Sequence, residues 1–186
     1  MNVFPFFGLN ESKTNSHYDN ANQIIPRLWL GNFASSQDTN FIKQNNITVI
    51  INCTKDLKFL KHPGIYKYRV PVHDNLEKDE IISMISWIAK ILPIIDFHYQ
   101  KNKVILIHCA AGMQRSAIVM LSYLYVYQTN DAGLALHLIK SRRPIAFTPY
   151  MNFKYSFCKK FGHSACRSLN NNKYGISVKG AYEINN

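Results

Sequence analysis

Residues 104–116 read VILIHCAAGMQRS, and this stretch decides the fold. Val104–Ile107 is a short apolar run typical of a buried strand, and the apolar residues from Ser116 to Tyr127 predict a helix. A short loop that begins with Cys109 joins the two. Because ligands of α/β sheets bind beyond the carboxyl ends of the strands, we expect this loop to lie in a binding site.

Strand and helix patterns alternate on both sides of this stretch. Strands are predicted at Arg27–Gly31, Ile47–Asn52, Tyr66–Val72 and Val104–Ile107. Helices are predicted at Ser35–Asn45, Glu77–His98, Ser116–Tyr127, Asp131–Arg142 and Thr148–Phe161, and Pro93 is expected to kink or end the second of them. This alternation predicts an α/β fold with a central, mostly parallel sheet and helices on both faces.

A chain of 186 residues suits one domain with short extensions. We expect an N-terminal extension at 1–22, the folded body at 23–162, and a tail at 163–186, where helical periodicity is lost. The apolar N-terminus, with Phe4, Phe6 and Phe7, is expected to pack on the body or to mediate dimerisation, so a monomer and a homodimer both stay open. It lacks the basic leader and long apolar core of a signal peptide.

The chain carries a formal charge of +11, which favours anionic partners such as phosphorylated substrates, nucleic acid or acidic membranes. No dense basic block is present, so a solvated basic surface is an equally simple explanation. We expect no membrane span, because charged residues such as Lys90 and Asp96 interrupt the apolar runs. The four cysteines show no metal-binding spacing, so no metal is expected and a reducing, cytoplasmic location is the default.

The loop after Cys109 has the composition of a phosphate cradle. Ala110, Ala111 and Gly112 are small enough for the backbone to close around an anion, and the following helix begins with its partial positive charge there. With Met113 and Gln114 these residues form the predicted substrate-binding loop. The inward amides and the nearby guanidinium of Arg115 favour a thiolate at Cys109, and the planar guanidinium can bind two phosphate oxygens at once.

These residues resemble a known family. The segment from His108 to Ser116 is similar to the loop of cysteine-based protein phosphatases, which reads His-Cys, five residues, Arg and Ser or Thr. The chain looks most like the small dual-specificity branch, including the enzymes of large DNA viruses. Residues 25–31 (IPRLWLG) resemble the opening strand of that branch, and Arg143-Pro144 with Pro149 and Phe153 resembles its late pattern, from which Tyr150 and Ser156 depart.

The resemblance implies a dual-specificity phosphatase-like fold, a metal-free mechanism without a cofactor, and phosphorylated protein substrates. It makes Cys109 the nucleophile that forms a phospho-cysteine, Arg115 the phosphate ligand, and Asp74 of the Val72-His73-Asp74 segment the general acid. Ser116 would hydrogen-bond the cysteine sulfur and His108 would order the loop. The substrates implied are phosphotyrosine, phosphoserine and phosphothreonine in proteins, in the cytoplasm of a host cell or in a virion if the source is viral.

Several alternatives stay open at this stage. Asp56 and Asp79 compete with Asp74 for the role of the acid. Cys53 is a packing residue or, less simply, a partner of Cys109 in a protective disulfide. The same loop also serves RNA 5′-triphosphatases and phosphoinositide phosphatases, although nucleic acid is the less favoured partner because no basic-aromatic stripe is present. A catalytically dead phosphate-binding module is the third alternative.

Overall fold

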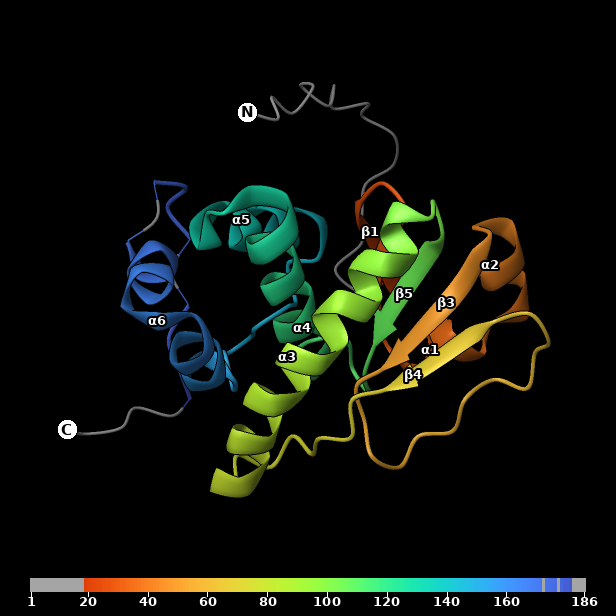
Figure 1. Cartoon of the computed structure of the whole chain (residues 1–186), viewed down its shortest axis with the longest axis horizontal. Coiled ribbons are helices and arrows are strands. Elements are labelled where there is room, and N and C mark those ends of the chain that lie inside the picture. Colours follow the sequence, from red (N-terminus) through yellow and green to blue (C-terminus); the bar gives the residue numbers. More distant parts are fainter. Residues whose placement is uncertain (1–18, 172, 177, 182–186) are drawn as a thin grey trace.

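The computed structural model describes residues 19–171, 173–176 and 178–181, and its centre is a five-stranded sheet (Figure 1). The strands are β1 (Ala21–Ile25), β2 (Leu28–Gly31), β3 (Ile47–Asn52), β4 (Tyr66–Arg69) and β5 (Val104–His108). Their order in the sheet is β1-β2-β5-β3-β4. Only the β1–β2 pair is antiparallel, and the other three pairs are parallel. The predicted mostly parallel sheet is confirmed.

Helices cover both faces of the sheet, as predicted. They are α1 (Phe33–Gln37), α2 (Thr39–Gln44), α3 (Lys78–Gln100), α4 (Arg115–Tyr123), α5 (Ala132–Arg142) and α6 (Lys154–Asn170), with a π-helical turn, η1 (Leu124–Thr129), after α4. Ile105 and Ile107 of β5 join the large core under helices α3 to α6. Leu106 joins a smaller core on the other face, with Ile42 of α2. Burial on both faces explains why β5 is continuously apolar in sequence.

The parallel register brings three strand ends to one edge of the sheet. His108, the last residue of β5, lies opposite Gly31 of β2 and Asn52 of β3. The connections that follow these strands therefore start side by side. The segment after β4 joins them, because the Val70 amide donates to the Asn52 carbonyl oxygen at 2.9 Å. This edge is where the predicted binding site should lie.

The N-terminal part of the structure differs from the prediction in two places. Strand β1 begins at Ala21, inside the predicted extension, and its Asn22 side chain is buried. The single helix predicted at Ser35–Asn45 is wrong, because two short helices are present. Asp38 ends α1 and caps α2 by accepting hydrogen bonds from the amides of Asn40 and Phe41. Residues 1–18, with the aromatic residues Phe4, Phe6 and Phe7, lie outside the described part of the chain.

Two proline residues affect where an element ends: Pro71 limits β4, and Pro93 does not end α3. The strand predicted at Tyr66–Val72 ends at Arg69, since Pro71 has no amide hydrogen for the ladder. Helix α3, in contrast, continues through Pro93 to Gln100. Pro93 lies on the exposed face of α3, and burial of Ile91, Leu92 and Ile95 on the opposite face offsets the missing backbone hydrogen bond.

The helix predicted at Asp131–Arg142 is confirmed by α5, with Asp131 as its cap. The last helix begins and ends elsewhere than predicted: its predicted start, with Thr148 as cap, is wrong, because residues 148–152 form a connection and α6 begins at Lys154. Helix α6 then runs to Asn170, with a break at Gly162, and buries Ala165 and Leu169. Residues 163–170 are therefore packed rather than a loose tail. Cys158 and Cys166 form a disulfide across the break, which the sequence analysis did not anticipate.

Helix α3 is long and apolar enough to cross a membrane by length and composition, which the sequence analysis did not expect, and it is the one such helix in the described part of the chain. Its residues Ile81, Met84, Ile88 and Ile95 belong to the core formed with the sheet. It also contacts α4 and α6. This packing accounts for its apolar composition in a globular domain without any bilayer.

Candidate active site

Cys109 lies at the floor of the loop between β5 and α4. Its side chain is buried, and its sulfur accepts two hydrogen bonds: one from the Gly112 amide at 3.3 Å and one from the Ser116 hydroxyl at 3.2 Å. Ser116 belongs to the first turn of α4, so the positive end of that helix faces the sulfur. Each of these contacts stabilises a sulfur anion.

Arg115 stands at the start of α4, and its side chain is 11% exposed. One terminal nitrogen, Nη1, donates to the Val72 carbonyl oxygen at 3.2 Å. Nε is buried and, within the described residues, has no hydrogen-bond partner; it lies 3.7 Å from Oδ2 of Asp74. A buried, cationic N–H group without a hydrogen bond is a ready donor for an incoming oxyanion.

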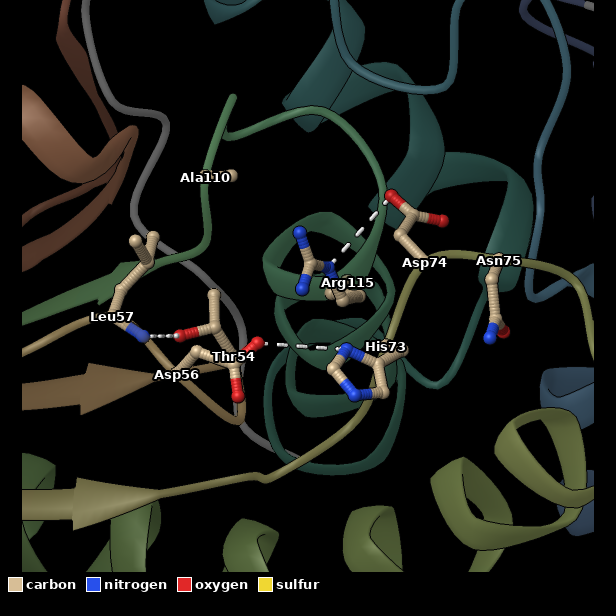
Figure 2. Close-up of a pocket in the computed structure, with 8 residues that line it drawn as sticks. All are labelled: Thr54, Asp56, Leu57, His73, Asp74, Asn75, Ala110 and Arg115. Carbon is tan, nitrogen blue, oxygen red and sulfur yellow. Dashed lines mark hydrogen bonds and ion pairs between the residues drawn. The ribbon is translucent and has the colours of Figure 1, made fainter.

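Asp74 and Arg115 lie next to each other in the wall of a pocket of about 520 Å³ (Figure 2). The pocket is lined by Thr54, Asp56, Leu57, His73, Asp74, Asn75, Ala110 and Arg115. Asp74 comes from the connection between β4 and α3, and its side chain is 24% exposed. Its carboxylate is therefore placed to exchange a proton with a ligand held by Arg115.

The two rival carboxylates are less suitable as the acid. Asp56 lines the same pocket, but its side chain is 78% exposed and its neighbour is the His73 ring, 3.8 Å away, rather than Arg115 (Figure 2). Asp79 lies in the first turn of α3 and is not among the residues that line the pocket. Asp74 stays the predicted acid because it alone of the three carboxylates contacts Arg115.

The loop conformation depends on Gly112 and on Arg143. Gly112 has φ +68°, and a Cβ there would come within 2.5 Å of the Gly31 carbonyl oxygen. The buried Arg143 donates from Nε to the Gly112 carbonyl oxygen at 2.8 Å and from Nη2 to that of Ala111 at 3.2 Å. Its Nη1 donates to the side chain of Asn22 at 2.7 Å. Burial lowers the pKa of Arg143 to about 10, so it stays protonated at neutral pH and its donors turn these carbonyls away from the pocket.

The remaining loop residues divide between the pocket and the body. Ala110 lines the pocket, and Ala111 is exposed. The Met113 carbonyl oxygen accepts from the Phe147 amide at 2.8 Å. The Gln114 side chain does not line the pocket; it donates to the Tyr150 carbonyl oxygen at 2.7 Å and accepts from the Asn152 amide at 3.1 Å. Gln114 thus ties the loop to residues 150–152.

His108 is fully buried at the end of β5. Its Nδ1 lies 3.4 Å from the Cys109 carbonyl oxygen, while Nε2 has no hydrogen-bond partner among the described residues. Burial lowers the pKa of His108 to about 4, and the positive charge of Arg69 acts in the same direction. The hydrogen bond to the Cys109 carbonyl oxygen raises the pKa but only partly offsets the effect of burial. His108 is therefore neutral at physiological pH, and any stabilisation that it gives the loop comes from hydrogen bonding rather than from charge.

Because His108 is buried and neutral, we expect the free energy of unfolding to fall in acid. The ordinary pKa of an unfolded histidine is about 6.5, so acid protonates the unfolded state first and stability is lost as the pH falls from about 6.5 to about 4. The full loss is on the order of 3 kcal/mol. Urea unfolding at several pH values should show a flatter pH dependence for His108→Asn than for the wild type. His163→Asn, at an exposed position, should keep the wild-type slope, and an unchanged slope in His108→Asn would contradict the assignment.

Cys53 is the other free cysteine in the described chain, and it is also buried. Its amide donates to the His108 carbonyl oxygen at 2.7 Å. Burial and the neighbouring Cys109 raise the pKa of Cys53 well above its ordinary value, and Arg115 opposes them. Cys53 is therefore a neutral thiol. Its pairing with Cys109 under oxidation stays a prediction.

Arg115 and Asp74 line the pocket with Ala110, which directly follows Cys109 in the loop. A buried cysteine sulfur, an arginine and a carboxylate in this arrangement define the class of site: a centre for covalent transfer of an oxyanion group. Within the described residues, no three histidine, cysteine or acidic side chains cluster as metal ligands would.

The comparisons with known proteins agree with this class. The family model of the dual specificity phosphatase catalytic domain matches residues 28–161. Human dual specificity protein phosphatase 21 is 31% identical over 153 residues, which is 80% of this chain and 77% of that protein. The chain belongs to the dual specificity phosphatase catalytic domain family.

Solved structures share the fold. A crystal structure of a human DUSP28 variant gives a TM-score of 0.69 at 22% identity, covering 76% of this chain and 94% of that one. A tyrosine phosphatase of the Orf virus, OH1, gives 0.58 at 20% identity, covering 76% and 86%. Several curated relatives are longer, and the matched part covers only 29% to 40% of their length.

Proposed function

We propose that this protein is a protein phosphatase that hydrolyses phosphotyrosine, phosphoserine and phosphothreonine through a phospho-cysteine intermediate. The observation that carries the proposal is the set of contacts around one pocket. The Cys109 sulfur accepts hydrogen bonds from Gly112 and Ser116, and Arg115 and Asp74 lie 3.7 Å apart in the pocket that the neighbouring Ala110 also lines. Family membership over residues 28–161 supports the same chemistry.

In the first step, the Cys109 sulfur attacks phosphorus and the bond from phosphorus to the leaving oxygen breaks. Arg115 binds two phosphate oxygens, and the loop amides bind the charge that develops on them. Asp74 gives its proton to the leaving oxygen, so that the product leaves as a neutral alcohol or phenol. The Ala111 and Gly112 carbonyls do not interfere, because Arg143 holds them.

In the second step, water attacks phosphorus and the bond between sulfur and phosphorus breaks. Asp74, now a carboxylate, accepts a proton from the water, and inorganic phosphate forms. The Ser116 hydroxyl hydrogen-bonds the departing sulfur and stabilises its negative charge. His108 orders the loop at the Cys109 carbonyl oxygen. In this cycle Cys109 forms and releases the covalent intermediate, and Asp74 makes both proton transfers.

The substrate class is tested by comparing rates of phosphate release from phosphotyrosine, phosphoserine and phosphothreonine peptides, from 5′-triphosphate RNA and from phosphoinositides. We expect the peptides to be the best substrates. The loop from Ala110 to Gln114 contains no lysine or arginine for the extra phosphates of the other two classes. A higher kcat/KM on the RNA or on the lipid would overturn the assignment to proteins.

A viral source and a cytoplasmic location belong to the same proposal. The abundance of Asn, Ile and Lys is typical of an AT-rich genome, as large DNA viruses often have. A catalytic thiol at Cys109 requires a reducing compartment, whereas the Cys158–Cys166 disulfide favours an oxidising one. Thiol labelling of the protein from fractionated cells tests the location. We expect the protein in a cytoplasmic fraction with a free Cys109 thiol, and the protein in a secreted fraction would contradict the proposal.

A further inference from the structure

The Asp74 carboxylate has a second partner that the sequence patterns did not single out. The Asn152 side-chain amide donates from Nδ2 to Asp74 Oδ1 at 2.7 Å. The two residues are 78 positions apart and come from different connections, one before α3 and one before α6. The contact is shorter than the 3.7 Å between Asp74 Oδ2 and Arg115 Nε. Asn152 is therefore the closest recorded partner of the carboxylate.

Asn152 is itself fixed to the phosphate-binding loop. Its backbone amide donates to Oε1 of Gln114 at 3.1 Å. Nε2 of the same buried Gln114 donates to the carbonyl oxygens of Tyr150 at 2.7 Å and Thr148 at 3.3 Å. Gln114 directly precedes Arg115. A chain of hydrogen bonds through Asn152 and Gln114 therefore connects Asp74 to the loop that precedes Arg115.

A second set of contacts orders this segment from its other side. The Met151 amide donates to the Lys179 carbonyl oxygen at 2.8 Å, and Met151 forms a parallel bridge with Gly180. The Lys154 ammonium group donates to the Val178 carbonyl oxygen at 3.0 Å. Contacts on both sides therefore hold the backbone that carries Asn152.

The two carboxylate oxygens of Asp74 are therefore unequal. Oδ1 accepts a hydrogen bond from a neutral amide, which needs an acceptor and disfavours a proton on that oxygen. Oδ2 faces Arg115, whose donors turn to phosphate oxygens when substrate binds. Once the arginine is engaged, Oδ2 is the oxygen free to carry the proton.

We propose that Asn152 is a positioning residue for the general acid: it holds Oδ1 so that Oδ2 delivers the proton to the leaving oxygen and recovers one from water. This inference rests on the proposed phosphatase function and deepens it. Asn152 is not among the residues that line the pocket, and the donors to the Cys109 sulfur are Gly112 and Ser116. The effect of Asn152 should therefore depend on how much the leaving group needs a proton.

The test compares two substrates in wild type and Asn152→Leu, which keeps the side-chain shape and removes the donor. An alkyl leaving group, from a phosphoserine peptide, needs protonation; an activated aryl leaving group, from p-nitrophenyl phosphate, hardly does. We expect kcat on the phosphoserine peptide to fall roughly tenfold, a part of the ~10²–10⁴-fold worth of positioned proton transfer. On the aryl phosphate kcat should stay within about twofold, with KM unchanged on both. Asn40→Leu, at an exposed position on α2, is the matched control.

A double-variant comparison separates positioning from damage to the fold. In an Asp74→Asn background the Asn152→Leu change should cost no further activity, because the group that it positions is already absent. An equal fall on both substrates, or a full additional loss in the double variant, would overturn the role. If Asn152→Leu melts below the assay temperature, Asn152→Ala, which leaves the backbone bond to Gln114, must show the same selectivity. Wild-type protein inactive on both substrates would instead refute the proposed function itself, and the positioning role with it.

Discussion

Cys109→Ser is expected to reduce turnover of every phosphate monoester to background, a loss of roughly 10⁶-fold, the scale of removing a covalent nucleophile. A serine hydroxyl keeps the size and the two hydrogen bonds from Gly112 and Ser116 but is not ionised at neutral pH. Arg115 and the loop amides remain, so the variant should still bind phosphopeptides. Steady-state rates and equilibrium binding on the same peptides measure the two effects.

The control for this prediction is Cys53→Ala, at the other buried free cysteine. Cys53 is a neutral thiol and has no part in the proposed mechanism, so the control should keep turnover of the wild-type order. Equal, background-level turnover by wild type and Cys109→Ser, with binding intact, would make the protein a phosphate-binding module rather than an enzyme.

Arg115→Lys is expected to lower kcat by about 10²–10³-fold, the range for removing one preorganised donor that stabilises the transition state. Lysine keeps the positive charge but has no planar fork for two phosphate oxygens. It also cannot reproduce the contacts of Arg115 with Val72 and Asp74 together. Inhibition by inorganic phosphate, measured beside kcat, should weaken in the same variant.

Arg142→Lys provides the matched control, because Arg142 is exposed at the end of α5. The same chemical change there should leave kcat and phosphate inhibition at wild-type values. Arg115→Lys with a normal kcat would show that charge alone, not the bidentate geometry, stabilises the transferring phosphate.

The sequence was informative where local patterns dominate. The apolar runs at Ile47–Asn52 and Val104–Ile107 predict β3 and β5, because strands buried on both faces must be continuously apolar. The small residues after Cys109 predict the loop, since only a tight backbone closes around an anion. Element boundaries were predicted less accurately. Thr148 and Pro149 form a local pattern typical of a helix start, so the start of α6 was predicted too early. In the structure the Gln114 side chain donates hydrogen bonds to the Thr148 and Tyr150 carbonyl oxygens, and these residues form a connection instead.

The supports of the site were beyond local patterns. Arg143, Asn22 and Asn152 act through contacts that span 31 to 121 residues, and no local pattern predicts the partners in these contacts. Arg143 stood in a family-like Arg-Pro pair, which could have indicated its importance but not its partners. Asn22 lies in the segment that was predicted to be an extension. A single buried polar residue, hydrogen-bonded to one distant arginine, produces no periodic pattern of apolar residues in the sequence.

The pairing of Met151 with residues 179–181 means that the folded domain extends beyond the family match. The family match ends at residue 161, yet the backbone that presents Asn152 to Asp74 is hydrogen-bonded to a strip of chain almost twenty residues further on. A protein shortened to the matched region would retain Cys109, Arg115 and Asp74. It would lose the backbone partners of Met151, so we expect Asn152 to hold the Asp74 carboxylate less firmly there than in the 186-residue chain.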